Sequence, residues 1–323
     1  MKAIRIDRPG GSETLKLVEL AVPTPRRGEA LVRVEAAGVN YHDIYVRSGA
    51  YPHEFPAVLG QEGAGTVETV GEEAGEVRVG QRVAWAGVPG SYATHVLAPA
   101  EKLVPVPEGV SARMAAASLL QGMTAHYLTN ATFPLKAGDT CLVHAAAGGA
   151  GLLVVQMAKR ANARVFGTTS SEAKNEIARE AGADECFLYS GREPFDEAVR
   201  ARTEGRGANV VYDSVGASTF DRSLLALRRR GVLVLFGQSS GRVPPFDLQL
   251  LNARGSLFVT RPKLGDYVAT RGELVERASA VLNAIARGEL AIRIHAEFPL
   301  SRAEDAHRAL ESRATSGKLV LVP

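Results

Sequence analysis

Hydrophobic and polar positions alternate along the first hundred residues in the way that is typical of short β-strands. Residues 29–37 carry small apolar side chains at every second position, and residues 90–98 repeat this pattern. Residues 66–70 follow a glycine-rich loop and form another expected strand. A short helix is predicted over 40–48, ended by Gly49. This part of the chain therefore predicts irregular β structure with many turns.

The pattern changes at Ser111, a residue type that is suited to cap a helix. Residues 111–129 are rich in alanine and free of proline, so they predict one long helix. Apolar runs then alternate with helical stretches. The expected strands are 140–147, 164–168, 209–213, 231–237 and 256–260, and the expected helices between them are 152–160, 171–181 and 219–229. Apolar strands separated by helices predict a parallel sheet that is covered on both faces.

The end of the chain predicts two helices, over 274–287 and 302–311, and a last strand over 318–322 that returns to the first domain. We therefore expect the first domain to contain both ends of the chain, with a nucleotide-binding domain between them. The expected domains are a β-rich one from 1–120 and 262–323 and an α/β one from 121–261.

Composition narrows the class of protein. The chain has 323 residues, of which 46% are hydrophobic and 23% charged, and a net charge of +3. Such a balance argues against a nucleic-acid surface, and no apolar run approaches the roughly 20 residues of a membrane span. Residues 1–7 lack the apolar core of a signal peptide. Cys141 and Cys186 are the only cysteines, too few for a disulfide framework or a cysteine-rich zinc site. We expect a soluble, cytoplasmic, two-domain protein.

A glycine-rich stretch lies between an expected strand and an expected helix, at residues 144–151. Read against the dinucleotide motif G-x-G-x-x-G, Gly148 and Gly151 fill the second and third glycine positions, while Ala146 replaces the first. Gly148 would let backbone amides approach a pyrophosphate at the start of the helix, and Gly151 would permit close packing of helix and strand. The alternative is a tight turn that binds no ligand.

The residues about 20 positions further on indicate which nucleotide is bound. Sites that prefer NAD usually carry an acid there, but this strand ends in hydroxyl residues. Ser170 and the ammonium of Lys174 are suited to a 2′-phosphate, which favours NADPH over NADH. Glu172 is the alternative acid, although its position inside the helix favours a solvated side chain.

Several stretches together resemble the quinone oxidoreductase family of the zinc-independent medium-chain dehydrogenases/reductases, close to the bacterial NADPH:quinone reductases that are related to ζ-crystallin. They follow the family's order over nearly the whole chain. The stretches are GVNYHD (38–43), RSGAYP (47–52), AAAGG (145–149), VYDSVG (211–216), FGQSSG (236–241) and ESRAT (311–315).

This resemblance implies an α/β fold: a Rossmann-type, doubly wound parallel sheet of six strands, together with a GroES-like, β-rich catalytic domain. It also implies NADPH as the cofactor and a homodimer. The implied cofactor contacts are Gly148, Gly149, Ala150 and Gly151 at the pyrophosphate, Ser170, Lys174 and Tyr189 at the 2′-phosphate, Ser214, Phe236, Gly237 and Ser239 at strand ends, Phe258 and Val259 near the nicotinamide, and Asn40, Tyr45, Tyr127 and Arg313 from the other domain or its connecting helix. Simpler roles are a helix cap for Asn40, packing for Tyr45 and an ion pair with Glu311 for Arg313.

Alcohol dehydrogenases of the same superfamily hold a catalytic zinc ion, and the matching positions here carry Asn40, Gln61 and, less securely aligned, Leu120. These side chains do not supply the thiolate and imidazole ligands that zinc prefers. His42, Asp43 and Glu62 are the alternative ligand set. We therefore expect no metal, and an acceptor that needs no Lewis acid.

Quinones fit that requirement, because their reduced product spreads charge over a conjugated frame. Asn40, Tyr45 and Tyr51 are the expected substrate contacts, through weak hydrogen bonds, and the tyrosines suit a flat partner. The prediction is an NADPH-dependent reductase of quinones, with other α,β-unsaturated carbonyls as the alternative substrates. The sequence assigns no catalytic residue and leaves the physiological substrate open.

Two other functions have some support in the sequence. The stretch 237–241 matches the hydrolase motif G-x-S-x-G, with His295 and His307 after it, but the residues 242–245 that follow contain two prolines and prevent the required helix. An NADPH-binding protein without catalytic activity would use the same glycines. Finally, residues 256–260 predict an apolar strand at the edge of the sheet, where a second copy would pair to form the homodimer.

Overall fold

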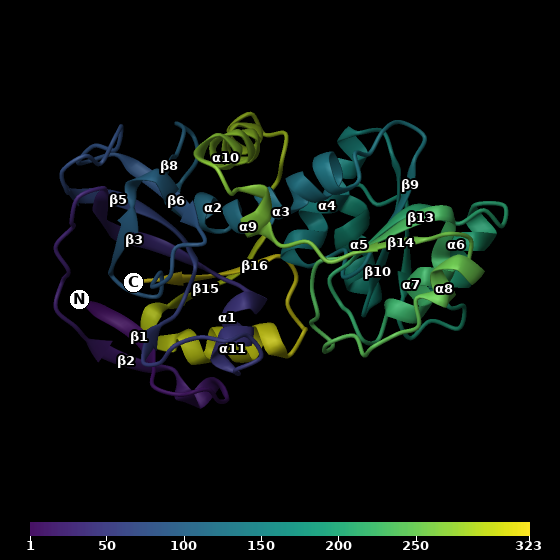
Figure 1. Ribbon diagram of the computed structural model, residues 1–323, viewed down its shortest axis with the longest axis horizontal. Helices are drawn as coiled ribbons and strands as arrows, with labels where there is room; N and C mark the ends of the chain where they lie inside the picture. Colours follow the sequence, from purple (N-terminus) through teal and green to yellow (C-terminus); the bar gives the residue numbers. More distant parts are fainter. The chain divides into compact units, whose positions relative to one another are not determined.

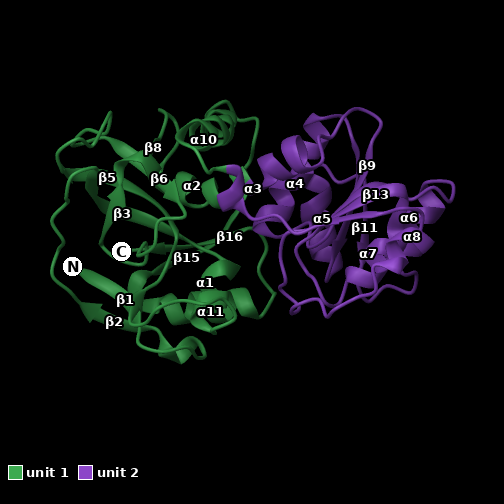
Figure 2. Cartoon of the chain, in the orientation of Figure 1, with its two compact units in different colours: residues 1–123, 268–323 green, residues 124–267 purple.

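The computed structural model describes all 323 residues, which form two compact units (Figure 2). Unit 1 combines Met1–Met123 with Val268–Pro323, and unit 2 consists of Thr124–Tyr267. Both ends of the chain thus belong to the same unit. None of the helices combines the length and the apolar character that are needed to span a lipid bilayer.

Unit 1 is built mainly from β-strands, with few and mostly short helices (Figure 1). Its elements are β1 (Lys2–Ile6), β2 (Lys16–Glu19), β3 (Glu29–Val39), α1 (Tyr41–Arg47), β4 (Ala57–Val58), β5 (Glu62–Val70), β6 (Arg82–Ala86), β7 (His95–Pro99), β8 (Val104–Pro105), α2 (Ala112–Ala116), α3 (Leu119–Tyr127, which continues into unit 2), α10 (Arg271–Ala286), β15 (Ile294–Pro299), α11 (Ala303–Glu311) and β16 (Lys318–Val322). Seven strands form one sheet in the order β15-β16-β3-β5-β6-β8, with β7 also paired to β3, and β2-β1-β4 form a second sheet.

The last strand is a central member of the large sheet of unit 1. β16 pairs antiparallel with β3, where Leu319 lies opposite Val39, and parallel with β15 on its other side. The return of residues 318–322 to the first part of the chain, expected from the sequence, is therefore confirmed. Leu319 and Leu321 join a core that contains the fully buried Trp85.

Unit 2 alternates strands and helices (Figure 1). After one turn of π-helix (Leu128–Thr132), its elements are β9 (Thr140–Val143), α4 (Gly149–Arg160), β10 (Arg164–Thr169), α5 (Glu172–Glu180), β11 (Glu185–Leu188), α6 (Phe195–Arg202), β12 (Ala208–Asp213), α7 (Phe220–Ala226), β13 (Leu227–Leu235), α8 (Gln249–Ala253), β14 (Phe258–Thr260) and α9 (Leu264–Tyr267). The six strands are all parallel, in the order β11-β10-β9-β12-β13-β14.

Both faces of this parallel sheet are buried. In β9, Leu142 lies in the core that α6 and α7 cover, while its neighbours Cys141 and Val143 point to the opposite face and are equally inaccessible to solvent. The order of the strands reverses between β9 and β12, which is where ligands bind in doubly wound sheets, beyond the carboxyl ends of the strands. The predicted Rossmann-type sheet is confirmed.

Two predicted helices are wrong in their extent. The single helix expected over 111–129 is divided between Ala116, where α2 ends, and Leu119, where α3 begins. The backbone N–H and the hydroxyl of Ser118 both donate to the Ala115 carbonyl and interrupt the helical hydrogen bonds there. Ser111 does cap α2 as expected. The helix expected over 219–229 ends at Ala226, because Leu227 already pairs with β12.

Three predicted boundaries also shift. The strand expected over 90–98 begins only at His95. Gly90 has a φ of +91°, which is not an extended conformation, and the N–H groups of Ser91 and Tyr92 donate to the carbonyls of Gly60 and Leu59 instead. The strand expected over 140–147 ends at Val143, and α4 begins at Gly149 rather than at Leu152. The last of these differences places Gly148 at the N-cap of α4 and Gly151 within the first turn of this helix.

Candidate functional site

The glycine-rich turn of unit 2 brings α4 against the end of β9. Ala145 has a φ of +50°, and its carbonyl accepts the N–H of Gly148 at 2.8 Å. A Cβ on Gly151 would lie 2.2 Å from that carbonyl oxygen, so only glycine permits this packing. The first N–H groups of α4 have no acceptor within the helix and carry its positive dipole end. This geometry suits an anionic group such as a pyrophosphate.

The end of β10 carries the residues that were expected at a 2′-phosphate. Ser170 is exposed after the last strand residue, and Ser171 caps α5 by accepting the N–H of Lys174. The Lys174 side chain is half-buried, and this burial lowers its pKa. The carboxylate of Glu172 accepts a hydrogen bond from Asn175 at 3.0 Å, so it is held against its own helix. A cation, and no free acid, therefore lies at this strand end.

Three further strand ends of unit 2 meet at the glycine-rich turn. The phenol oxygen of Tyr189 accepts the N–H of Ala145 at 2.8 Å, and Tyr189 is 38% exposed. The hydroxyl of Ser214 donates to the carbonyl of His144 at 3.5 Å, and the carbonyl of Ser214 accepts the N–H of Ser239 at 3.2 Å. Phe236 and Gly237 follow β13 and are half-buried. A Cβ on Gly237 would lie 2.5 Å from the carbonyl oxygen of Ser214.

The remaining predicted residues of unit 2 lie in different surroundings. Tyr127 is only 1% exposed and stacks on Tyr267 with ring centroids 4.1 Å apart. Burial raises the pKa of Tyr127. On the edge strand β14, Val259 packs against the core and Phe258 is 60% exposed. Their contacts with a cofactor stay predictions.

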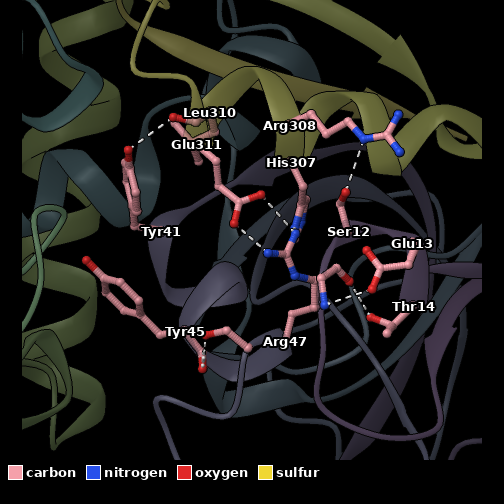
Figure 3. Close-up of polar contacts among 12 residues, drawn as sticks. Ser12, Glu13, Thr14, Tyr41, Tyr45, Arg47, His307, Arg308, Leu310 and Glu311 are labelled. Atoms are coloured by element: carbon pink, nitrogen blue, oxygen red, sulfur yellow. Dashed lines mark hydrogen bonds and ion pairs between the residues drawn. The ribbon is translucent and has the colours of Figure 1, made fainter.

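In unit 1, the predicted substrate residues form an aromatic cluster on and after α1. The Tyr45 ring lies 5.1 Å from that of Tyr51, and His42 meets Tyr51 edge-on at 5.4 Å. Burial lowers the pKa of His42 to about 4, so its imidazole is neutral at pH 7. Figure 3 shows Tyr41 and Tyr45 beside the end of α11, where Tyr41 donates to the Leu310 carbonyl at 3.0 Å. Arg313, which interacts with the Tyr41 hydroxyl, follows in the left-handed conformation at a φ of +56°.

The side chain of Asn40 is held by a buried ion pair. The ammonium of Lys318 donates to Glu62 Oε2 and to Asn40 Oδ1, both at 2.7 Å, and the Asn40 amide donates to Glu62 Oε2 at 3.0 Å. The side chains of Lys318 and Glu62 are 1% and 0% exposed. Turning the Asn40 amide over would point its N–H groups at the Lys318 ammonium and its oxygen at the Glu62 carboxylate, so its orientation is fixed. Its N–H groups point to Glu62 and the Gly38 carbonyl, which leaves one acceptor lone pair.

A second buried chain of hydrogen bonds runs from α1 to α11. Asp43 accepts from the Asn40 N–H and from the Tyr92 hydroxyl, both at 2.9 Å, and burial raises the pKa of Asp43 to about 7. Tyr92 contacts His307 Nε2 at 3.2 Å, and Arg47 donates to His307 Nδ1 at 3.3 Å. Because Arg47 only donates, the His307 proton lies on Nε2 and the imidazole donates to Tyr92.

The outer end of this chain is an ion pair that joins α1 to α11. Figure 3 shows the Arg47 guanidinium facing both oxygens of Glu311, with His307 beside it. Arg47 is 2% exposed. Burial, and next the positive charge of Arg47, lower the pKa of His307 to about 3. Both ring nitrogens of His307 are therefore used within unit 1.

The hydrolase motif at 237–241 lacks its structural setting. No helix follows Ser239 until Gln249, and the chain between them is irregular. A nucleophile elbow requires a direct turn from strand to helix. The helix-breaking role expected for residues 242–245 is confirmed.

Comparison with known proteins agrees with this fold. Residues 26–108 match a family described as the alcohol dehydrogenase GroES-like domain, and residues 149–270 match one described as zinc-binding dehydrogenase. The quinone oxidoreductase of Pseudomonas aeruginosa is 44% identical, over 100% of this chain and 99% of the relative. The crystal structure of Escherichia coli quinone oxidoreductase complexed with NADPH has a TM-score of 0.97 at 40% identity, over 100% of both chains.

The chain belongs to the quinone oxidoreductase family. A 2-haloacrylate reductase from a Burkholderia species is also similar, at 40% identity over 98% of both chains. The resemblance that the motifs indicated is therefore confirmed, together with a GroES-like domain beside a parallel α/β sheet.

One of the two matched families has zinc in its description. This member of the quinone oxidoreductase family carries Asn40, Gln61 and, less securely aligned, Leu120 at the positions that match the zinc ligands of alcohol dehydrogenases. No group of three or more His, Cys, Asp or Glu side chains is arranged to hold a metal ion. Glu62, one of the alternative ligands, accepts from Lys318, Asn40 and the Leu120 N–H.

Sequence reasoning missed Lys318 altogether. The one available signal was a lysine at the start of a strand whose other residues, 319–322, are all apolar. Its partners lie more than 250 positions earlier in the sequence. His144, the first residue of the glycine-rich stretch 144–151, likewise has no role in the sequence-based prediction.

The buried ion pair predicts a large loss of stability when one partner is removed. Lys318→Met leaves the Glu62 carboxylate buried without a counter-charge, so we expect the free energy of unfolding to fall by about 3–5 kcal/mol. Adding Glu62→Gln should restore at least half of this loss, because the buried charge is gone and Asn40 is free to turn over. Urea denaturation of both variants measures the effect; equal stability of the single and double variants would contradict it.

The raised pKa of Asp43 predicts a pH-dependent stability. The pKa is about 7 in the folded protein and about 3.9 when unfolded, so this contribution is complete below pH 4 and is lost as the pH rises toward 7. Relative to Asp43→Asn, the wild type should therefore lose on the order of 1–4 kcal/mol between about pH 4 and pH 8.

Urea denaturation of both proteins across this pH range checks the prediction. His307, whose folded pKa is about 3, acts in the opposite direction between about pH 6.5 and 3, but it is present in both proteins. A stability difference that does not change with pH would show that Asp43 titrates as it does in water.

Proposed function

We propose that this chain is an NADPH-dependent reductase of quinones. The observation that carries the proposal is the pairing of two features in unit 2: an anion-binding turn at the start of α4 and the half-buried Lys174 at the end of β10. The names of its relatives support the proposal, since they are quinone oxidoreductases, and a similar one was crystallised with NADPH.

The residues of unit 2 fit the cofactor. Gly148, Gly149, Ala150 and Gly151 would hold the pyrophosphate through backbone N–H groups at the start of α4, where their side chains are absent or small. Ser170, Lys174 and Tyr189 would hold the 2′-phosphate, and the pairing of Glu172 with Asn175 leaves that position without a competing acid. NADPH supplies a hydride when it is bound.

The other predicted contacts are proposed on the family resemblance. They are Ser214, Phe236, Gly237, Ser239, Phe258, Val259 and Tyr127 from unit 2, and Asn40, Tyr45 and Arg313 from unit 1. We also propose that residues 121–261 act as the NADPH-binding domain and that 1–120 with 262–323 act as the GroES-like catalytic domain.

Tyr45, Tyr51 and Asn40 are the proposed substrate contacts. The aromatic cluster on α1 supports a flat, conjugated acceptor, which the two tyrosines would contact through their rings and hydroxyls. Asn40 would serve as a hydrogen-bond acceptor only, because both of its amide hydrogens are used internally. Activated alkenes are the alternative substrates, and the similarity to a 2-haloacrylate reductase supports this alternative.

The proposed function predicts that the purified chain binds NADPH and oxidises it with a small quinone. Isothermal titration calorimetry with NADPH and NADH measures binding, and the loss of NADPH absorbance with p-benzoquinone or crotonaldehyde measures turnover. Quinone reduction faster than enal reduction is the expected result. No affinity for NADPH would overturn the proposal, and binding without turnover of any acceptor would favour the non-catalytic alternative.

Two lysine variants sharpen this experiment. Lys174→Met should weaken NADPH binding by about 10- to 100-fold and leave NADH binding unchanged, because only the 2′-phosphate loses its partner. Lys159→Met is the matched control, since Lys159 belongs to the same unit but pairs with Asp184. If both variants weaken NADPH binding equally, Lys174 acts only through the net charge of the protein and does not contact the 2′-phosphate.

We also propose a homodimer and a cytoplasmic location. β14 is an edge strand whose free side offers unpaired backbone groups, and the exposed Phe258 makes this edge apolar. Sedimentation at micromolar concentration should show a dimer, and Phe258→Lys should shift it toward monomer. A monomeric wild type would contradict the proposal.

A further inference from the structure

A histidine that the proposed function does not use lies directly before the glycine-rich turn. His144 is fully buried at the end of β9. Its Nδ1 lies 2.7 Å from the Thr168 hydroxyl, on β10, and its Nε2 lies 2.9 Å from the Ser223 hydroxyl, on α7. Its backbone N–H donates to the Tyr212 carbonyl, on β12, at 3.0 Å. One residue thus links three strands and a helix.

The surrounding acceptors fix the position of the His144 proton. The Ser223 hydroxyl has one hydrogen, and its two other neighbours, Asp213 Oδ2 at 3.1 Å and the Thr219 carbonyl at 2.8 Å, only accept. Ser223 must therefore accept from Nε2–H of His144, and Nδ1 accepts the hydroxyl hydrogen of Thr168. Burial lowers the pKa of His144, in agreement with a neutral ring.

This hydrogen-bond chain ends on a carboxylate whose acceptor sites are fully used. Asp213 Oδ1 accepts the N–H groups of Val215 and Gly216, at 2.7 and 2.9 Å. Its Oδ2 accepts the hydroxyls of Thr219 and Ser223, at 2.7 and 3.1 Å. Four donors hold the charge of Asp213 in place without a cation. The Ser223 hydroxyl therefore donates on this side, with its one hydrogen shared between Asp213 Oδ2 and the Thr219 carbonyl, and accepts from His144 on the other.

The same chain holds the glycine-rich turn itself. The Ala146 N–H donates to the Thr168 carbonyl at 3.0 Å, so Thr168 fixes both the turn and the His144 ring. The His144 ring stacks at 6.0 Å on Tyr189, whose oxygen accepts the Ala145 N–H. Ala145 adopts the left-handed conformation that residues other than glycine rarely adopt, and this hydrogen bond holds it there.

We propose that His144, fixed by Thr168 and Ser223, is a positioning residue that holds the turn 145–151 in the conformation that binds the dinucleotide. This inference rests on the proposed function. None of the three side chains needs to touch the cofactor, because all three are fully buried. Their effect passes through the backbone of Ala145 and Ala146.

The experiment compares two substitutions of Thr168. Thr168→Val keeps the shape of the side chain but removes the hydroxyl, so Nδ1 of His144 loses its donor and the ring is free to rotate; Thr168→Ser keeps the hydroxyl. We expect the Kd for NADPH, measured by calorimetry, to rise about 5- to 30-fold in Thr168→Val and less than about twofold in Thr168→Ser. The KM for quinone at saturating NADPH should not change.

A matched control separates positioning from stability. Thr203 is a buried threonine of the same unit whose hydroxyl donates to the Val199 carbonyl and accepts the Gly207 N–H, at the far end of α6. Thr203→Val should lower Tm and leave the Kd for NADPH unchanged. If Thr168→Val lowers Tm in the same way without weakening binding, the proposal is overturned. If Thr168→Val does not fold, Ser223→Ala, which removes the other partner of the ring, replaces it in the same comparison.

The state of the His144 ring can also be measured by NMR without any bound cofactor. Nitrogen NMR of the ring should show His144 as the neutral Nε2–H tautomer at pH 7 in the wild type. In Thr168→Val the signal should shift or broaden. An unchanged signal in Thr168→Val, or a wild type with the proton on Nδ1, would overturn the proposal. Failure of the wild type to bind NADPH would instead overturn the proposed function, so the two failures are distinguishable.

Discussion

The close approach of α4 to the end of β9 is the constraint on which the candidate site depends. A Cβ at position 151 would lie 2.2 Å from the Ala145 carbonyl oxygen, so the helix reaches this position only because glycine stands there. The approach directs the first N–H groups of α4 beyond the carboxyl end of the sheet. Ala145 adopts the left-handed conformation in this turn. A hydrogen bond from its N–H to the Tyr189 hydroxyl, at the end of a neighbouring strand, supports that conformation. The anion site at the start of α4 and the hydrogen bonds that support Ala145 thus both depend on the close contact between Gly151 and Ala145.

Each unit uses buried polar groups in a different way. In unit 2, the carboxylate of Asp213 is neutralised by four hydrogen-bond donors, and its chain ends at a neutral histidine. In unit 1, the carboxylate of Glu62 is paired with the ammonium of Lys318, which also fixes the amide of Asn40. Neither group is exposed to solvent. Since an unpaired buried charge is costly, such groups hold their surroundings in one arrangement.

The family and the chemistry of the turn agree on the class of reaction. Membership in the quinone oxidoreductase family rests on similarity over the whole chain. The turn, Lys174 and the pairing of Glu172 with Asn175 give a physical reason for a phosphorylated dinucleotide. The lysine ammonium beside Asn40 means that a positive charge already lies next to one of the positions that match the zinc ligands of alcohol dehydrogenases. Position and hydrogen bonding therefore carry the proposed chemistry.

The sequence by itself determined the α/β class, the parallel sheet, the glycine-rich turn and the return of the last strand, because these depend on local periodicity and on glycines at fixed spacing. It did not determine where the helix after Ser111 breaks, because the local competition of the Ser118 hydroxyl for the Ala115 carbonyl leaves the helical pattern of the sequence unchanged. Nor did it determine where α7 gives way to β13, because Leu227 pairs with Ala208, which is distant in sequence. Only the tertiary structure could show that Lys318 meets Glu62 or that His144 bridges Thr168 and Ser223. Such partners leave no periodic signal, since a buried hydrogen bond depends on positions in space and not on spacing along the chain.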